Sequence, residues 1–231
     1  MIPCKWKQLW DKEVALDWTV VTSNAPLFVS ATLNTVAIAA ATIVLSVFIA
    51  FPLAIMRDSR FGFLRWVSAG YSWTTRAMPT LSLLFLAYYG LPQFGIYLDP
   101  VVAAITGLTV IAAGYNMEYI RVGLQAVPAG QYEACRALGI PLSIALRRLI
   151  VPQAMRTILP PLTSNLTLLL KGSALASLVA VTELSGQAMA LISYTYKPIE
   201  ILIAVALIYL CLNGVLVGVQ RLVEQRYRLQ D

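Results

Sequence analysis

Histidine is missing from this sequence, and charged residues are scarce. The 231 residues include no histidine, three cysteines and only 12% Asp, Glu, Lys and Arg, whereas soluble domains carry about 25% charged residues. Without histidine, histidine-based zinc motifs and any catalytic triad or general base that uses histidine are excluded. Cys4, Cys135 and Cys211 form no CxxC pair, and an odd number this far apart predicts no disulfide framework. We therefore expect no metal site and no catalytic residue.

A phosphate-binding loop is also missing. No GxxxxGK[ST] motif occurs in the chain, so the chain cannot cradle the phosphates of ATP itself. The net charge of +6 would suit a nucleic-acid partner, but the basic residues lie beside apolar stretches, where they act as orientation signals. We therefore expect the lipid bilayer as partner, and no nucleic acid.

Long apolar runs are what the sequence has in abundance. Hydrophobic residues make up 59% of the chain, and they gather in stretches of about 20 residues, the length that a transmembrane helix needs. A β-barrel would show short alternating segments instead. The sequence therefore predicts an all-α membrane protein with about five transmembrane helices, at residues 25–56, 66–90, 100–120, 158–184 and 199–219.

Positive charges are distributed unevenly between the predicted connections. Lys and Arg gather in the loop after the first span, in the long loop after the third span and in the C-terminal tail, whereas the opposite connections carry only Lys197. Because positively charged loops stay in the cytoplasm, we expect the N-terminus outside, and the long loop and the C-terminus inside.

The same distribution predicts the domain organisation. We expect an extracytoplasmic tail at 1–24, either unstructured or an interfacial helix with Trp6 and Trp10 at headgroup level. A single transmembrane domain would follow at 25–219, with its cytoplasmic loop at about 121–157, and then a cytoplasmic tail at 220–231.

The long cytoplasmic loop has two helical segments with a break between them. Residues 131–138 are good helix formers, and Gly139 stands where a helix end favours a left-handed residue. Pro141 suits the first turn of a new helix, and residues 142–150 have apolar side chains at helical spacing. Pro152 then breaks or kinks this second helix. The pattern predicts two short helices with a rigid elbow, which lie on the membrane face and dock onto a soluble partner.

This loop resembles the EAA loop of ATP-binding-cassette importer permeases. Glu133-Ala134-Cys135, three further residues, Gly139, nine further residues and the segment 149–152 (LIVP) reproduce the spacing of that motif. In that family the loop inserts into a cleft of the cytoplasmic ATPase and transmits its closure to the spans. The resemblance implies a coupling surface, composed of Glu133, Ala134, Cys135, Arg136, Ala137 and Gly139.

Further motifs resemble the polar amino acid subgroup of these permeases, the histidine, glutamine and opine type. They follow in the family order and at the family spacing. They are RAMP at 76–79, YYGLP at 88–92, AGYNMEYIRVGL at 113–124, VPAGQ at 127–131 and KGSAL at 171–175.

The resemblance implies a type I importer permease fold with a cytoplasmic coupling-helix loop, in the bacterial cytoplasmic (inner) membrane. It implies a non-catalytic subunit of an ATP-driven importer for polar amino acids or their derivatives. The implied partners are a cytoplasmic ATP-binding-cassette ATPase dimer, a second permease subunit, identical or homologous, and an extracytoplasmic solute-binding protein. ATP and Mg would bind to the ATPase, so no cofactor is expected on this chain.

Charged residues inside the predicted spans each need a reason, because each costs about 3 kcal/mol to insert. Glu118 either pairs with Arg121 one turn later or lines the substrate route. Glu183 either snorkels to water or attracts the amino group of a substrate. Both interpretations remain open for each residue.

The basic residues and one aromatic residue of the spans raise the same question. Lys171 either has a structural partner in the bundle or belongs to the pathway. Arg76 either reaches from a helix end to lipid phosphate or, with Pro79, marks a broken helix whose freed backbone lines a cavity. Tyr115 is a further candidate for the pathway.

Two other functions compete with the importer. A secondary transporter or channel for small polar solutes would use an ion gradient, but five spans without a visible inverted repeat argue against it. A membrane-embedded transferase is the other, but the lack of histidine and of paired intramembrane carboxylates argues against catalysis.

Overall fold

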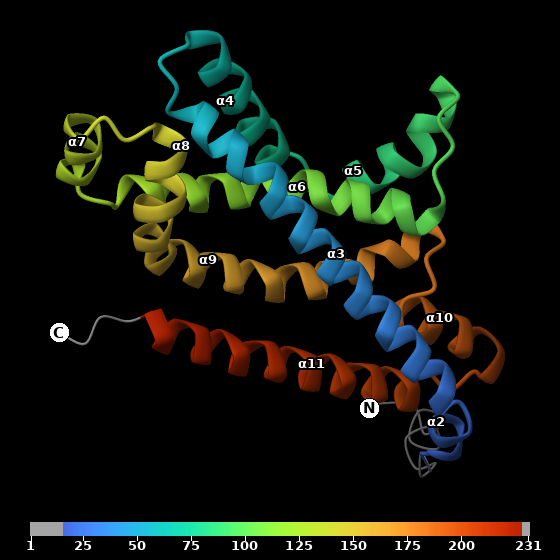
Figure 1. The fold of residues 1–231 in the computed structure, drawn as a ribbon. Coiled ribbons are helices and arrows are strands. Elements are labelled where there is room, and N and C mark those ends of the chain that lie inside the picture. Colours follow the sequence, from blue (N-terminus) through green and yellow to red (C-terminus); the bar gives the residue numbers. More distant parts are fainter. Residues whose placement is uncertain (1–15, 228–231) are drawn as a thin grey trace, which may run out of the picture.

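The computed structural model describes residues 16–227, and this part of the chain consists of helices and short connections without any strand (Figure 1). A short helix, α2 (Thr19–Ser23), precedes the first long helix. The interfacial helix considered around Trp6 and Trp10 lies outside the described residues.

Within residues 16–227, four helical stretches are long and apolar enough to cross a membrane. They are α3 (Ala25–Arg57), α6 (Pro100–Gln125), the continuous stretch Leu142–Val179, and α11 (Pro198–Tyr227). In Figure 1, α9 lies between α6 and α11, and α3 crosses these helices. The predicted spans at 25–56, 100–120 and 199–219 are confirmed as single helices.

The predicted second span, 66–90, is not a single helix. It divides into α4 (Gly62–Ala77) and α5 (Thr80–Phe85), followed by a π-helical turn, η1 (Leu86–Gly90), and a 3₁₀ turn, η2 (Leu91–Phe94). Met78 and Pro79 between α4 and α5 are extended, because the residue before a proline is biased away from the helical region. The expectation of about five helices thus becomes four unbroken helices and one broken pair.

The cytoplasmic loop predicted at 121–157 is shorter in the structure. Its first helical segment forms α7 (Ala129–Ala137), as expected. The second does not form a separate short helix, because α8 (Leu142–Ala145), the π-helical turn η3 (Leu146–Ile150), α9 (Val151–Gly172) and the 3₁₀ turn η4 (Ser173–Val179) follow without interruption. The helical stretch that contains the predicted fourth span therefore begins before residue 158.

Prolines account for the error in this region. Pro152 lies in the first turn of α9, directly after a π-helical turn in which the N–H of Val151 bonds to the carbonyl of Leu146. A π turn shifts the hydrogen-bond register, so a residue without an N–H fits at that point. Pro160 and Pro161, expected at the start of a span, lie inside α9.

Glycines set the distance between α6 and its neighbours. A Cβ at Gly114 would lie 1.9 Å from Oγ1 of Thr75 in α4, and a Cβ at Gly123 would lie 2.2 Å from Cγ1 of Ile158 in α9. Such small residues let membrane helices approach closely. α6 is therefore the central helix, and it contacts α3, α4 and α9.

Candidate transport pathway and coupling surface

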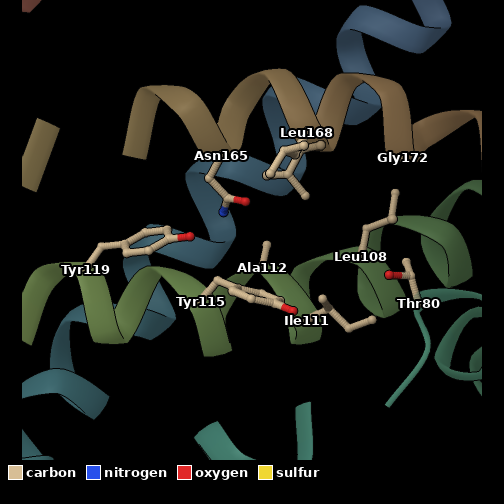
Figure 2. A pocket seen from close by; sticks show the side chains of 10 residues that line it. Thr80, Leu108, Ile111, Ala112, Tyr115, Tyr119, Asn165, Leu168 and Gly172 are labelled. Atoms are coloured by element: carbon tan, nitrogen blue, oxygen red, sulfur yellow. The ribbon is translucent and has the colours of Figure 1, made fainter. Parts of the chain in front are cut away.

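A cavity of about 250 Å³ lies mainly between α6 and α9. Most of its wall is apolar, and the polar exceptions are two tyrosines, one threonine and one asparagine, which is a composition typical of small-molecule sites. Figure 2 shows Tyr115 and Tyr119 on α6, with Asn165 directed from α9 toward them. The full lining is Thr80, Leu108, Ile111, Ala112, Tyr115, Tyr119, Asn165, Leu168, Leu169 and Gly172.

Asn165 belongs to a buried chain of hydrogen bonds across three helices. Its Nδ2 donates to Oδ1 of Asn116 at 2.7 Å, and Nδ2 of Asn116 donates to Oγ of Ser46 at 2.9 Å. Ser46, Asn116 and Asn165 were not among the residues predicted for the site, although two asparagines within apolar spans were a visible signal. Polar side chains of this kind join helices in membranes.

Arg76 and Tyr115, both predicted for the pathway, are brought together. The guanidinium carbon of Arg76 lies 5.7 Å from the centroid of the Tyr115 ring, within the range of a cation–π contact. The broken helix predicted at Pro79 is present, and Thr80, directly after it, lines the cavity. Arg76 itself is exposed and contacts a cavity residue without lining the cavity.

Glu118 forms the local pair that was one of its two interpretations. Its carboxylate accepts from Nε of Arg121 at 2.9 Å and from the hydroxyl of Ser72 at 2.8 Å, and Nε of Arg57 lies 3.9 Å away. These groups join α3, α4 and α6 at the α7 end of the bundle. Glu118 does not line the cavity.

Lys171 lies beside the cavity residue Gly172, and its side chain is exposed. Within residues 16–227 it forms no hydrogen bond or ion pair, so the structural partner considered for it is not found in this part of the chain. Nor do Cys, Asp and Glu side chains gather here in a group of three that could hold a metal ion.

Glu183 is fully buried, so the interpretation that it snorkels to water is wrong. It is the N-cap of α10 (Leu184–Thr195) and accepts from the N–H of Gly186 at 2.8 Å. Its other oxygen accepts from the hydroxyls of Tyr209 at 3.0 Å and Thr35 at 3.4 Å. The carboxylate thus joins α3, α10 and α11, and it does not line the cavity.

The residues of the predicted coupling surface lie on or just after α7. Glu133, Ala134, Arg136, Ala137 and Gly139 are exposed, whereas Cys135 is only 6% exposed and faces the protein. Cys135 therefore does not belong to the exposed surface in which it was predicted. Its position follows from helix geometry, because an amphipathic helix buries one stripe of residues.

The end of α7 has a well-defined hydrogen-bond pattern. Gly139 has φ of +65°, its N–H bonds to the carbonyl of Arg136, and the N–H of Ile140 bonds to the carbonyl of Cys135. These two bonds form a Schellman motif, in which glycine is favoured because it has no Cβ. The predicted helix end and elbow at Gly139 are confirmed.

A tyrosine attaches α7 to the long helices. The hydroxyl of Tyr132 donates to the carbonyl of Leu124, near the end of α6, at 2.8 Å. Burial of the phenol, together with the nearby charge of Asp58, raises the pKa of Tyr132 above its ordinary value. The tyrosine therefore stays protonated at neutral pH and keeps this donor.

Comparison with known proteins places the fold. The family model of the binding-protein-dependent transport system inner membrane component matches residues 43–229. The octopine transport system permease protein of Rhizobium meliloti is 38% identical over 185 residues, which cover 76% of each chain. The nopaline transport system permease protein of Agrobacterium fabrum is 32% identical over 219 residues, 90% of this chain and 91% of the relative.

Solved structures of ABC transporters are similar to this chain as well. A chain of an amino acid ABC transporter crystallised with histidines superposes with a TM-score of 0.84 and 32% identity, over 92% of this chain and 100% of that chain. The MetNI methionine ABC transporter, at 21% identity and a TM-score of 0.77 over 90% of this chain and 99% of that chain, supports the fold alone. The predicted type I importer permease fold is confirmed. The chain therefore belongs to the family of binding-protein-dependent transport system inner membrane components, the permease subunits of ATP-binding-cassette importers.

Proposed function

We propose that this permease imports polar amino acids or amino-acid derivatives, opines included. The observation that carries the proposal is the cavity between α6 and α9, which combines an apolar wall with a few polar groups. The relatives that support this substrate class include the octopine and nopaline permeases and, at 37% identity over 161 residues, a probable glutamine ABC transporter permease of Bacillus subtilis.

The polar groups of the cavity suit a zwitterion. Arg76 brings a positive charge against Tyr115, on the cavity wall, where it favours a substrate carboxylate. Asn165 presents an amide to the same cavity. Leu108, Leu168 and Leu169 contribute apolar side chains to the wall around these polar groups.

Coupling is the second part of the proposal. The exposed face of α7, with Glu133, Ala134, Arg136, Ala137 and Gly139, docks into a groove of a separate ATPase dimer. The hydrogen bond of Tyr132 to the carbonyl of Leu124 attaches α7 to α6, so a displacement of α7 moves a helix that lines the cavity. ATP and Mg bind to the ATPase, and this chain takes no part in hydrolysis. A second permease subunit and a solute-binding protein complete the assembly.

The membrane orientation follows from the positive charges. The N-terminus lies outside, and α7 and the C-terminus face the cytoplasm of the bacterium. With the native cysteines replaced, an Arg226→Cys variant is expected to resist a membrane-impermeant thiol reagent in intact cells and to react after permeabilisation, because Arg226 is exposed at the end of α11. Labelling in intact cells would show the opposite topology.

The function is tested by ligand-stimulated ATP hydrolysis. The permease is purified with its ATPase and solute-binding protein, and hydrolysis is measured with glutamine, arginine, histidine, octopine and nopaline, with leucine as the apolar control. We expect at least one polar ligand to stimulate hydrolysis severalfold, with vanadate-sensitive, ATP-dependent uptake in proteoliposomes. Uptake that follows an ion gradient without ATP would favour the secondary transporter instead.

A further inference from the structure

The buried hydrogen-bond chain from Ser46 to Asn165 has a fixed direction. The hydroxyl of Ser46 donates to the carbonyl of Ile43 at 2.9 Å, within α3. A hydroxyl has a single proton, so toward Asn116 the Ser46 oxygen acts only as an acceptor. It accepts a hydrogen bond from Nδ2 of Asn116 at 2.9 Å. The amide of Asn116 is therefore oriented with its oxygen toward α9.

The orientation passes on to the cavity. Oδ1 of Asn116 accepts from Nδ2 of Asn165 at 2.7 Å, so the amide nitrogen of Asn165 is used inside the bundle. Asn116 is fully buried and Asn165 is 6% exposed. Oδ1 of Asn165 receives no hydrogen bond from any residue in the range 16–227, and Asn165 lines the cavity, as Figure 2 shows.

We propose that Oδ1 of Asn165 reads the substrate, by accepting a hydrogen bond from an N–H group of the ligand. The inference rests on the proposed function and deepens it, since it names what the ligand must present: an ammonium, guanidinium or amide N–H. Ser46 and Asn116 are positioning residues, which keep the acceptor rather than the donor of Asn165 toward the cavity.

The surroundings make this acceptor selective. The cavity lining contains no charged side chain. The hydrogen bond to Oδ1 of Asn165 therefore forms only when the ligand itself presents a donor. A buried acceptor that loses its partner is costly, and sites of this kind reject ligands that lack the matching group far more strongly than apolar pockets do.

The test measures how tightly ligands with and without the N–H donor bind to the permease–ATPase complex in nanodiscs. The binding protein is left out. The probes are glutamine and arginine, their analogues without the α-amino group (glutaramate and 5-guanidinopentanoate), and glutamate γ-methyl ester, which lacks the side-chain N–H. We expect the wild-type complex to prefer at least one N–H ligand over its analogue by about tenfold or more. In Asn165→Leu this preference should fall to within about twofold.

Two further variants test the hydrogen-bond chain from Ser46 to Asn165, and they keep the inference testable if Asn165→Leu does not fold. Asn165→Asp keeps an acceptor and should favour arginine about tenfold more than the wild type does. Ser46→Ala frees the amide of Asn116 to turn, so the N–H preference should fall although Ser46 is remote from the ligand. Thr167→Val removes a hydroxyl from α9 that bonds only to Ser164 and does not line the cavity, and its selectivity should match the wild type.

The outcomes separate this inference from the proposed function. If the wild type binds the probes but Asn165→Leu keeps the full N–H preference, the inference is wrong and the function stands. Should Asn165→Leu fail to assemble, unchanged selectivity in both Asn165→Asp and Ser46→Ala overturns it equally. If the wild type neither binds nor transports any probe, both the function and the inference fail.

Discussion

A Gly139→Val variant is expected to lose more than nine-tenths of ATP-dependent uptake while it still reaches the membrane. Gly139 has φ of +65°, and an L-residue in this region costs roughly 1–2 kcal/mol, with β-branched side chains worse still. A Cβ at this position meets nothing within 4 Å, so the effect comes from the backbone alone. The strain opens the Schellman motif and turns the exposed face of α7 away from the ATPase.

Uptake in proteoliposomes, membrane yield and ligand-stimulated ATP hydrolysis measure this effect. Gly139→Asn is the matched control, because asparagine tolerates the left-handed region, and it should keep most of the uptake. Gly130→Ala, on the same helix, has open space around the added Cβ and no positive φ, so it should resemble the wild type. Normal uptake in Gly139→Val would show that the elbow is not needed for coupling.

Replacing Glu183 with leucine is expected to destabilise the permease by about 3 kcal/mol, because buried donors that lose their acceptor cost about 1–3 kcal/mol each. The N–H of Gly186 and the hydroxyl of Tyr209 both lose their acceptor. The loss acts on three helices at once, since the carboxylate joins α3, α10 and α11. The melting temperature of the purified permease should fall by about 6–12 °C, with a lower membrane yield.

Glu183→Gln separates a structural role from substrate recognition. Glutamine keeps the shape and one acceptor oxygen, so we expect a smaller loss of melting temperature and an unchanged ranking of ligands. A glutamine variant with normal stability and altered ligand selectivity would instead support the interpretation that the carboxylate attracts a substrate amino group.

The structure thus places carboxylates at both ends of the bundle and a neutral cavity between them. Glu118 and its basic partners join α3, α4 and α6 at the α7 end, and Glu183 joins helices at the other end. Neither residue lines the cavity. Glu118 and Glu183 therefore hold helices together, and the cavity lining itself carries no charged side chain.

Local patterns were enough for the membrane class, three of the spans, and the helix end at Gly139. Each of these depends on residues close together in the chain: a run of apolar side chains long enough to span, or a glycine after a helix-forming segment. The error at Pro152 arose because the effect of a proline depends on its context: a helix ends before Pro79, whereas Pro152 is accommodated by a π turn.

The amino-acid order alone specified a helical membrane protein with a bent coupling segment, because hydropathy and turn chemistry act over a few residues. Only the tertiary structure decided that Glu183 is buried and that the amide nitrogen of Asn165 is bonded to Asn116 inside the bundle. These facts depend on partners far away in the chain, 148 residues for Thr35 and Glu183, and 70 and 49 residues along the path from Ser46 to Asn165. Packing brings such partners together, and no local pattern encodes which atom of an amide then remains free.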